Sequence, residues 1–138
     1  MTNEFDEFCG PEIRELFPHG ECWCECDEGW WKPIRAALTL IIRDYHNSVK
    51  QREMLLNNNP HNHPIPELFD KPQVFQIKEK FGGVRLYIDG GDYRYIQGVE
   101  NMLEYWCGST CEVCGDQGAR TNRGGRGWLK TVCEAHNV

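Results

Sequence analysis

The sequence has little of what a membrane-spanning or secreted protein needs. Its longest apolar stretch, around Ala36 to Ile42, falls well short of the roughly 20 residues required to cross a bilayer. The segment from Met1 to Phe8 carries acids where a signal peptide has basic and then apolar residues. We therefore expect a soluble cytoplasmic protein with no membrane partner, whose eight cysteines stay reduced rather than forming a disulfide framework.

Motifs of common enzyme classes are also missing. The chain has no nucleophile elbow, no phosphate-binding glycine loop and no His-Glu-x-x-His helix. Zinc-knuckle nucleases of the His-Asn-His type carry paired histidines close to a Cys-x-x-Cys turn, whereas no histidine lies between Cys114 and Cys133. His61 and His63 are paired, but they lie far upstream in a proline-rich loop. We predict no enzymatic activity, and a divergent zinc-knuckle nuclease is the enzymatic alternative.

Four potential metal ligands lie near the C-terminus in two pairs. Cys111 and Cys114 form the first pair, and after eighteen intervening residues Cys133 and His136 form the second. Zinc prefers four such ligands at tetrahedral corners, and Gly115 permits the left-handed turn that follows a Cys-x-x-Cys pair. Four protein ligands leave no open coordination position, so we predict a structural Zn²⁺. The alternative is four reduced side chains without a metal.

Charge is distributed unevenly along the chain. Nine of the acids lie within residues 1–28, where Arg14 is the only basic residue, although the net charge of the whole chain is only −6. The remaining residues are nearly neutral, with fourteen basic and twelve acidic side chains. Between the ligand pairs, a single acid, Asp116, accompanies a local basic patch. The basic residues of this patch are Arg120, Arg123, Arg126 and Lys130.

Helical spacing predicts three helices. A short helix over 11–17 starts at a proline and is stopped by Pro18. A long helix starts near Trp30 and ends at the asparagines of 57–59. A further helix follows the capping residue Asp92. The apolar stripe of the long helix comprises Ile34, Leu38, Ile41, Tyr45 and Val49. The stripe of the last helix comprises Ile96, Val99, Leu103 and Trp106.

From residue 74 the apolar period changes to two, which predicts an antiparallel hairpin. Phe75 and Ile77 alternate with polar residues in its first strand, and Gly82–Gly83 is a two-residue turn signal. The second strand alternates in the same way through Val84, Leu86 and Ile88. The chain is thus predicted to be a single α+β domain over 1–138. Its parts are an acidic, cysteine-rich segment 1–28, an α+β core 29–107 and a zinc knuckle 108–138.

Several of these motifs occur together in one family. The run from Lys78 to Tyr87, Lys-Glu-Lys-Phe-Gly-Gly-Val-Arg-Leu-Tyr, is followed by a helix, by Cys-Glu-Val-Cys-Gly and by Gly-Trp-Leu-Lys-Thr-Val-Cys-Glu-Ala-His. With Cys-Asp-Glu-Gly-Trp-Trp at the start of the long helix, the chain resembles a family of short, largely uncharacterised proteins of bacteriophages, prophages and bacteria. The resemblance covers about residues 26 to 136. It implies the fold and the zinc site but no established activity, and residues 1–28 depart from the pattern.

Aromatic content favours a binding function. Five tryptophans and eleven other aromatic residues exceed what a small core needs, and such residues are enriched in protein interfaces. An acidic surface with aromatic anchors, such as Phe5, Phe8 and Trp23, suits a basic protein target. If the phage resemblance holds, the predicted partner is a host protein in the host cytoplasm, with inhibition of a host or defence factor as the natural role.

Nucleic-acid binding, or sequestration of an anionic nucleotide signal, is the alternative function. Basic side chains of the loop between the two ligand pairs, together with those of the hairpin, could contact phosphates. The Trp128 indole ring in the same loop could stack on a base. The candidate residues for binding a ligand or partner are Lys80, Arg85, Tyr87, Arg120, Arg123, Arg126, Trp128 and Lys130. A second metal site is a further open question, for which the candidate ligands are Cys9, His19, Cys22, Cys24 and Cys26.

Overall fold

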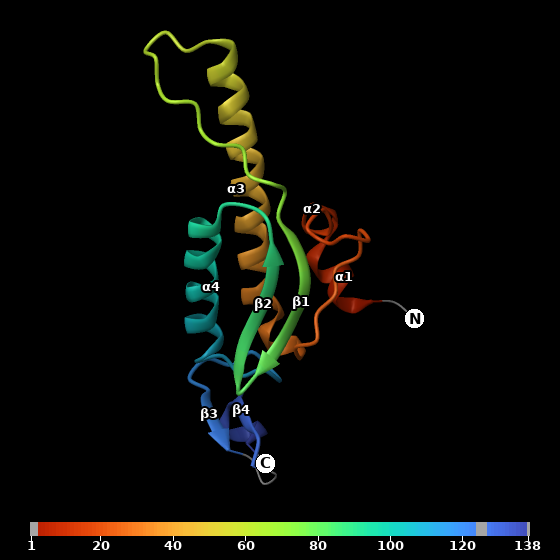
Figure 1. Cartoon of the computed structure of the whole chain (residues 1–138). Helices are drawn as coiled ribbons and strands as arrows, with labels where there is room; N and C mark the ends of the chain where they lie inside the picture. The colour runs from red at the N-terminus through yellow and green to blue at the C-terminus, as the bar shows by residue number, and fades with distance from the viewer. Residues whose placement is uncertain (1–2, 124–126, 138) are drawn as a thin grey trace.

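The computed structural model of the protein describes residues 3–123 and 127–137. Its fold is α+β, as predicted, with a long helix beside a second helix, a β-hairpin against them, and a small second hairpin at one end (Figure 1). The N-terminal helices lie on one side of the main hairpin, and the helix of residues 93–107 lies on the other (Figure 1). Within the described residues, every helix is too short or too polar to cross a membrane.

The N-terminal segment forms two short helices. Helix α1 spans Glu4–Cys9, which the sequence analysis missed, and helix α2 spans Pro11–Arg14. The predicted start of α2 at Pro11 is correct, but the helix ends before Phe17. Turns continue the chain instead, because the amide of Leu16 donates to the Ile13 carbonyl at 2.9 Å. The buried side chains of Ile13, Leu16 and Phe17 still join the main core.

The long helix begins after a short 3-10 helix. This turn, η1, spans Glu28–Trp30, and α3 continues over Trp31–Asn57, close to the predicted bounds. Its N-terminal half is packed into the core through Ile34, Leu38 and Ile41, which are almost completely buried. The C-terminal part extends beyond the rest of the molecule, and the following loop returns beside it (Figure 1). Therefore only the first half of the predicted stripe is fully buried.

The main hairpin consists of β1, Gln73–Lys80, and β2, Gly83–Asp89. Lys80 pairs with Gly83, so the two turn residues are Phe81 and Gly82 rather than the predicted Gly82–Gly83. Both turn residues have positive φ, 54° for Phe81 and 81° for Gly82, as a two-residue hairpin turn of the primed type requires. Two adjacent glycines permit either position of the turn, so the sequence alone did not fix it.

The first strand of the hairpin contains a β-bulge that the sequence did not predict. The strand register shifts between Val74 and Gln76, which leaves Phe75 as the extra residue of β1. Val74 and Ile77 therefore point into the core, while the Phe75 side chain is 62% exposed. The prediction that the side chains of Phe75 and Ile77 lie on the same face of the strand is therefore wrong.

The left-handed conformation of Phe81 leads to a stability prediction. A non-glycine residue at positive φ costs about 1–2 kcal/mol, and asparagine tolerates that conformation far better. We expect Phe81→Asn to stabilise the protein by about 1 kcal/mol, since the Phe81 ring is 72% exposed and contributes little core burial. Chemical denaturation of the two proteins would measure this change. A variant less stable than the wild type would contradict the prediction.

Helix α4 covers Tyr93–Cys107 and starts at the predicted cap, where the Asp92 carboxylate accepts a hydrogen bond from the Arg94 amide at 3.1 Å. The apolar stripe of this helix is buried as expected, except at its end. There Cys107 takes the inward position and is fully buried, whereas Trp106 remains 38% exposed. The core side chains of α3, α4 and the hairpin form one cluster with those of the N-terminal segment.

Candidate metal centre and adjoining cleft

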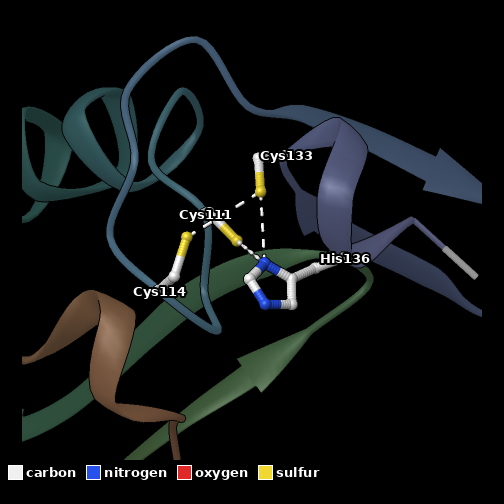
Figure 2. Close-up of side chains that lie close together, drawn as sticks. All are labelled: Cys111, Cys114, Cys133 and His136. Atoms are coloured by element: carbon white, nitrogen blue, oxygen red, sulfur yellow. Dashed lines mark hydrogen bonds between the residues drawn. The ribbon is translucent and has the colours of Figure 1, made fainter.

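The C-terminal segment brings all four predicted metal ligands together. The ligand atoms of Cys111, Cys114, Cys133 and His136 lie within 4.8 Å of one another. Figure 2 shows the three sulfurs and the Nδ1 atom of His136 turned toward a common centre. Among the described residues, this is the only group of three or more cysteine, histidine or acidic side chains close enough to hold a metal ion. The predicted Cys3His cluster is thus confirmed as a possible metal site.

The distances between ligand atoms fit tetrahedral coordination. Zinc–ligand bond lengths place two sulfurs about 3.8 Å apart and a sulfur about 3.6 Å from a nitrogen. The sulfurs of Cys114 and Cys133 are 3.8 Å apart, and Nδ1 of His136 lies 3.7 Å from the Cys111 sulfur. Its distance to the Cys133 sulfur, 3.2 Å, is somewhat shorter. The side chains therefore surround a space that suits one tetrahedral ion.

The backbone around Cys111 favours the thiolate form of this cysteine. Gly115 has φ of 85°, as expected for this turn, and its amide donates to the Cys111 carbonyl at 2.8 Å. Burial opposes ionisation of Cys111, but backbone amides of Cys133, Cys114 and Val113 outweigh it and lower the pKa of Cys111 to about 6. A thiolate is the form of cysteine that binds metal.

The loop between the two ligand pairs contains a second hairpin that the sequence did not predict. Strand β3, Arg120–Arg123, pairs antiparallel with β4, Leu129–Val132, and the 3-10 helix η2, Glu134–His136, then carries the last ligand. Cys111, which is also one of the four candidate ligands, packs with Ala119 and Val132 in a small core of its own. The knuckle, as described over residues 108–123 and 127–137, is thus a compact unit beside the main core.

Buried polar contacts fasten the knuckle to the start of the long helix. The indole N–H of Trp30, which is fully buried, donates to the Thr110 carbonyl at 2.8 Å. The Gly29 amide donates to the Glu112 carbonyl at 2.7 Å, and the Asp27 amide donates to Glu112 Oε2 at 3.1 Å. The Gly-Trp pair at the start of the long helix therefore holds the segment with the candidate metal ligands in place.

The knuckle also contacts the turn of the main hairpin. The Thr131 hydroxyl donates to the Gly82 carbonyl at 2.6 Å and is itself 2.6 Å from the Thr121 hydroxyl. A side chain at Gly82 would overlap the Thr121 methyl group, with its Cβ at 2.7 Å. The two hairpins are thus in contact end to end, as Figure 1 shows.

A cleft lies between the two hairpins and the segment before η1. It is lined by side chains of both charges and by two large exposed rings, and we call it the hairpin cleft. Its lining residues include Glu25, Asp27, Lys78, Glu79, Lys80, Phe81, Glu112, Arg123, Trp128 and Lys130. Four predicted binding residues, Lys80, Arg123, Trp128 and Lys130, therefore meet at one place.

The other predicted binding residues lie elsewhere. Arg85 lies 3.8 Å from the Glu104 carboxylate of α4, and Tyr87 on β2 has the Lys78 ammonium 5.9 Å from its ring centre. Arg120 is exposed on β3, opposite Val132 and outside the lining of the hairpin cleft. Arg126 lies outside the described residues.

Acidic side chains of the hairpin cleft were not identified from the sequence. The local sequence suggests a basic patch with few acids near it. In the structure, however, the Lys130 ammonium lies 3.3 Å from the Asp27 carboxylate. Glu112 is 4% exposed, and burial raises the pKa of its carboxyl group. These acids come from three distant segments of the chain. Their only sequence signal is the acidic character of residues 1–28 and the acid next to Cys111.

The N-terminal cysteines are not arranged as a second metal site. Cys22 and Cys26 are buried, whereas the Cys24 sulfur accepts a hydrogen bond from the Cys26 amide at 3.3 Å. Within residues 3–123 and 127–137, neither these cysteines nor Cys9 and His19 belong to a group close enough to share an ion. The four cysteines Cys9, Cys22, Cys24 and Cys26 pack in or against the main core instead, whereas His19 is exposed.

Comparison with protein families, with curated proteins and with solved structures finds no significant match. The resemblance to phage and bacterial proteins, which depends on the sequence motifs, therefore stays a prediction. Any functional conclusion has to come from the residues of the metal centre and the hairpin cleft.

Proposed function

We propose that this is a non-catalytic binding protein, stabilised by a structural Zn²⁺, that binds another protein through the hairpin cleft. Three cysteine sulfurs and one imidazole nitrogen at tetrahedral spacing support zinc, and four protein ligands leave no position for a substrate. The metal then serves to fix the knuckle, and the knuckle forms one wall of the cleft. The binding surface is therefore separate from the metal itself.

The observation that carries this proposal is the conformation and exposure of Phe81. An aromatic residue occupies a left-handed turn position where asparagine or glycine would be more stable, and most of its ring faces solvent. Strain of this kind persists where a residue is needed for something other than stability. Trp128, which is 76% exposed, lines the same cleft. Two exposed aromatic rings beside one cleft are typical anchors of a protein interface.

Charge favours a protein over a polyanion as the ligand. The hairpin cleft contains four carboxylates, those of Glu25, Asp27, Glu79 and Glu112, across from its basic side chains. A nucleic acid or nucleotide would meet these carboxylates as well as the lysines, and like charges at close range oppose binding. A folded protein or peptide can present both signs of charge in a matching pattern.

The resemblance to phage proteins makes a host protein the candidate partner. Under this proposal the protein acts in the host cytoplasm and inhibits a host or defence factor by occupying its surface. Nucleotide or nucleic-acid binding through Arg120 and Arg123 is the competing proposal, because both side chains are exposed. A nuclease mechanism has less support, because four protein ligands leave no open metal position and the cluster contains a single histidine rather than a pair.

A pull-down from host extract with matched variants tests the binding proposal. We expect Trp128→Ala and Phe81→Ala each to weaken binding of the captured protein about tenfold or more, the size typical of aromatic anchors. Tyr93→Ala is the control, because Tyr93 is 71% exposed on α4 and lies outside the cleft lining. Affinities would be measured with the purified partner by calorimetry.

Two results would contradict the proposal. One is a partner whose affinity is unchanged in both cleft variants, which would place the interface elsewhere. The other is copurification of a compound absorbing near 260 nm, or binding to DNA or RNA that falls steeply with salt, without a protein partner. That outcome would favour the polyanion alternative.

A further inference from the structure

Glu112 has a hydrogen-bonding capacity that the rest of the described chain leaves unused. Glu112 belongs to the lining of the hairpin cleft, although the residue is only 4% exposed. Oε2 accepts a hydrogen bond from the Asp27 amide at 3.1 Å. Oε1 is buried and, within the described residues, has no hydrogen-bond partner. A buried acceptor without a donor is unfavourable, and a bound donor would remove that cost.

The neighbouring charges make a cationic donor the best match. The carboxylates of Asp27 and Glu79 line the same cleft as Glu112. The ammonium of Lys130 is 3.3 Å from Asp27 Oδ2 and does not reach Glu112 Oε1. Lys78, Lys80, Arg123 and Lys130 balance the four carboxylates of the cleft as a whole. The charges that act on Glu112 itself are those of Asp27, Glu79 and Lys130, so a positively charged donor at this position would meet more negative than positive charge.

A metal ion does not fit this position. Across 3–123 and 127–137, the Cys3His cluster is the only set of acidic, cysteine or histidine side chains with ligand atoms close enough to share an ion. Glu112, Asp27 and Glu79 are therefore too far apart to act as a cation cage. The donor must instead be an organic cation, which can contact one carboxylate through hydrogen bonds and reach it on a flexible stem.

Two aromatic rings favour a guanidinium on such a stem. Phe81 and Trp128 line the same cleft and are 72% and 76% exposed. An arginine side chain can lay its methylene groups against such rings and stack its planar head on an indole face. It also carries five N–H donors, so it can serve Glu112 and an adjacent carboxylate together.

We propose that the hairpin cleft receives an arginine side chain of the partner protein, whose guanidinium donates to Glu112 Oε1. This inference rests on the proposed protein-binding function and names what the cleft recognises. Phe81 and Trp128 provide the apolar walls, and Glu112 provides the specific acceptor at the inner end. Asp27 and Glu79 add attraction for the positive charge.

A pair of small probes tests the recognition without knowledge of the partner. N-acetyl-arginine amide and N-acetyl-citrulline amide have nearly the same shape, but citrulline is neutral. Titration of the zinc-loaded full chain, followed by NMR shifts of the 111–113 amides and the Trp128 indole, should give a dissociation constant on the order of millimolar for the arginine probe. We expect the citrulline probe to bind about tenfold more weakly or not measurably. Equal binding of both probes would overturn the proposal.

Variants of two glutamates separate a specific contact from general attraction. Glu112→Gln keeps the shape and an acceptor for the Asp27 amide, and it should weaken binding of the arginine probe about tenfold. Glu25→Gln removes an equal charge from an exposed residue of the same cleft and should change binding less than about twofold. Equal losses in both variants, or no loss in Glu112→Gln, would overturn the role of Glu112. If Glu112→Gln fails to fold, the two-probe comparison decides.

The same variants distinguish failure of this inference from failure of the proposed function. A captured partner that loses affinity with Trp128→Ala but not with Glu112→Gln leaves the binding function standing and overturns only the arginine contact. A partner insensitive to all cleft variants overturns both.

Discussion

Replacing Cys133 with serine is expected to release the metal and to destabilise the protein by at least about 3 kcal/mol. The Cys133 sulfur is 3.8 Å from the Cys114 sulfur and 3.2 Å from the His136 ring nitrogen, so one substitution opens the whole ligand set. Within the described residues, the buried apolar cluster of the knuckle consists of the ligand Cys111 with Ala119 and Val132, which is a small core to hold the knuckle without metal. The melting temperature should fall by about 10 °C or more.

Cys9→Ser is the matched control for this change. Cys9 is half-buried and lies outside the cluster, so the same chemical substitution should cost no more than about 1 kcal/mol and leave the metal content unchanged. Calorimetric melting with and without a chelator would measure both effects. If the two variants melt together, or if the chelator leaves the wild-type transition unchanged, the knuckle does not depend on a metal.

We expect Gly29→Ala to lower the stability of the protein strongly, because Gly29 lies where the knuckle packs against the start of the long helix. The new Cβ would lie 2.5 Å from the Glu112 carbonyl oxygen and closer still to that of Cys111. Both obstacles are backbone atoms next to a metal ligand, so neither can move without displacing the site. We expect a loss of about 3 kcal/mol or more, together with loss of the Gly29 amide hydrogen bond to Glu112.

Gly98→Ala is the matched control, because it adds the same methyl group at a position where we expect it to stabilise the protein. A Cβ at Gly98 meets nothing within 4 Å, and the residue is exposed within α4. Alanine there should stabilise the protein by about 0.5–1 kcal/mol, through helix propensity alone. Chemical denaturation of the pair measures the contrast. A Gly29→Ala variant within about 0.5 kcal/mol of the wild type would show that the knuckle is not docked on η1 as described.

Local patterns in the sequence predicted most of the elements. The spacing of Ile34, Leu38 and Ile41 predicts the long helix, and the spacing of the ligand pairs predicts the Cys3His cluster that could hold a metal. The errors arose where two local solutions were equally allowed. Adjacent glycines at 82 and 83 admit two turn positions, and the bulge at Phe75 depends on which residues of the finished strand meet the core.

The hairpin cleft could not be predicted from local patterns. Its acids come from the segment before η1, from β1 and from the knuckle, and only the docking of Trp30 and Gly29 against 110–112 brings them together. The sequence showed a basic loop with one acid nearby, whereas the fold places Asp27 within 3.3 Å of Lys130. The fold therefore balances the basic side chains of the cleft with an equal number of acidic ones.

The most direct test of the account is the mass of the intact protein under native conditions. A structural Cys3His centre with no second cluster among the N-terminal cysteines predicts one zinc ion per chain, removed only by acid or a strong chelator and with loss of the folded charge-state distribution. A folded chain at the mass of the bare polypeptide, with the same melting transition in the presence of chelator, would contradict it.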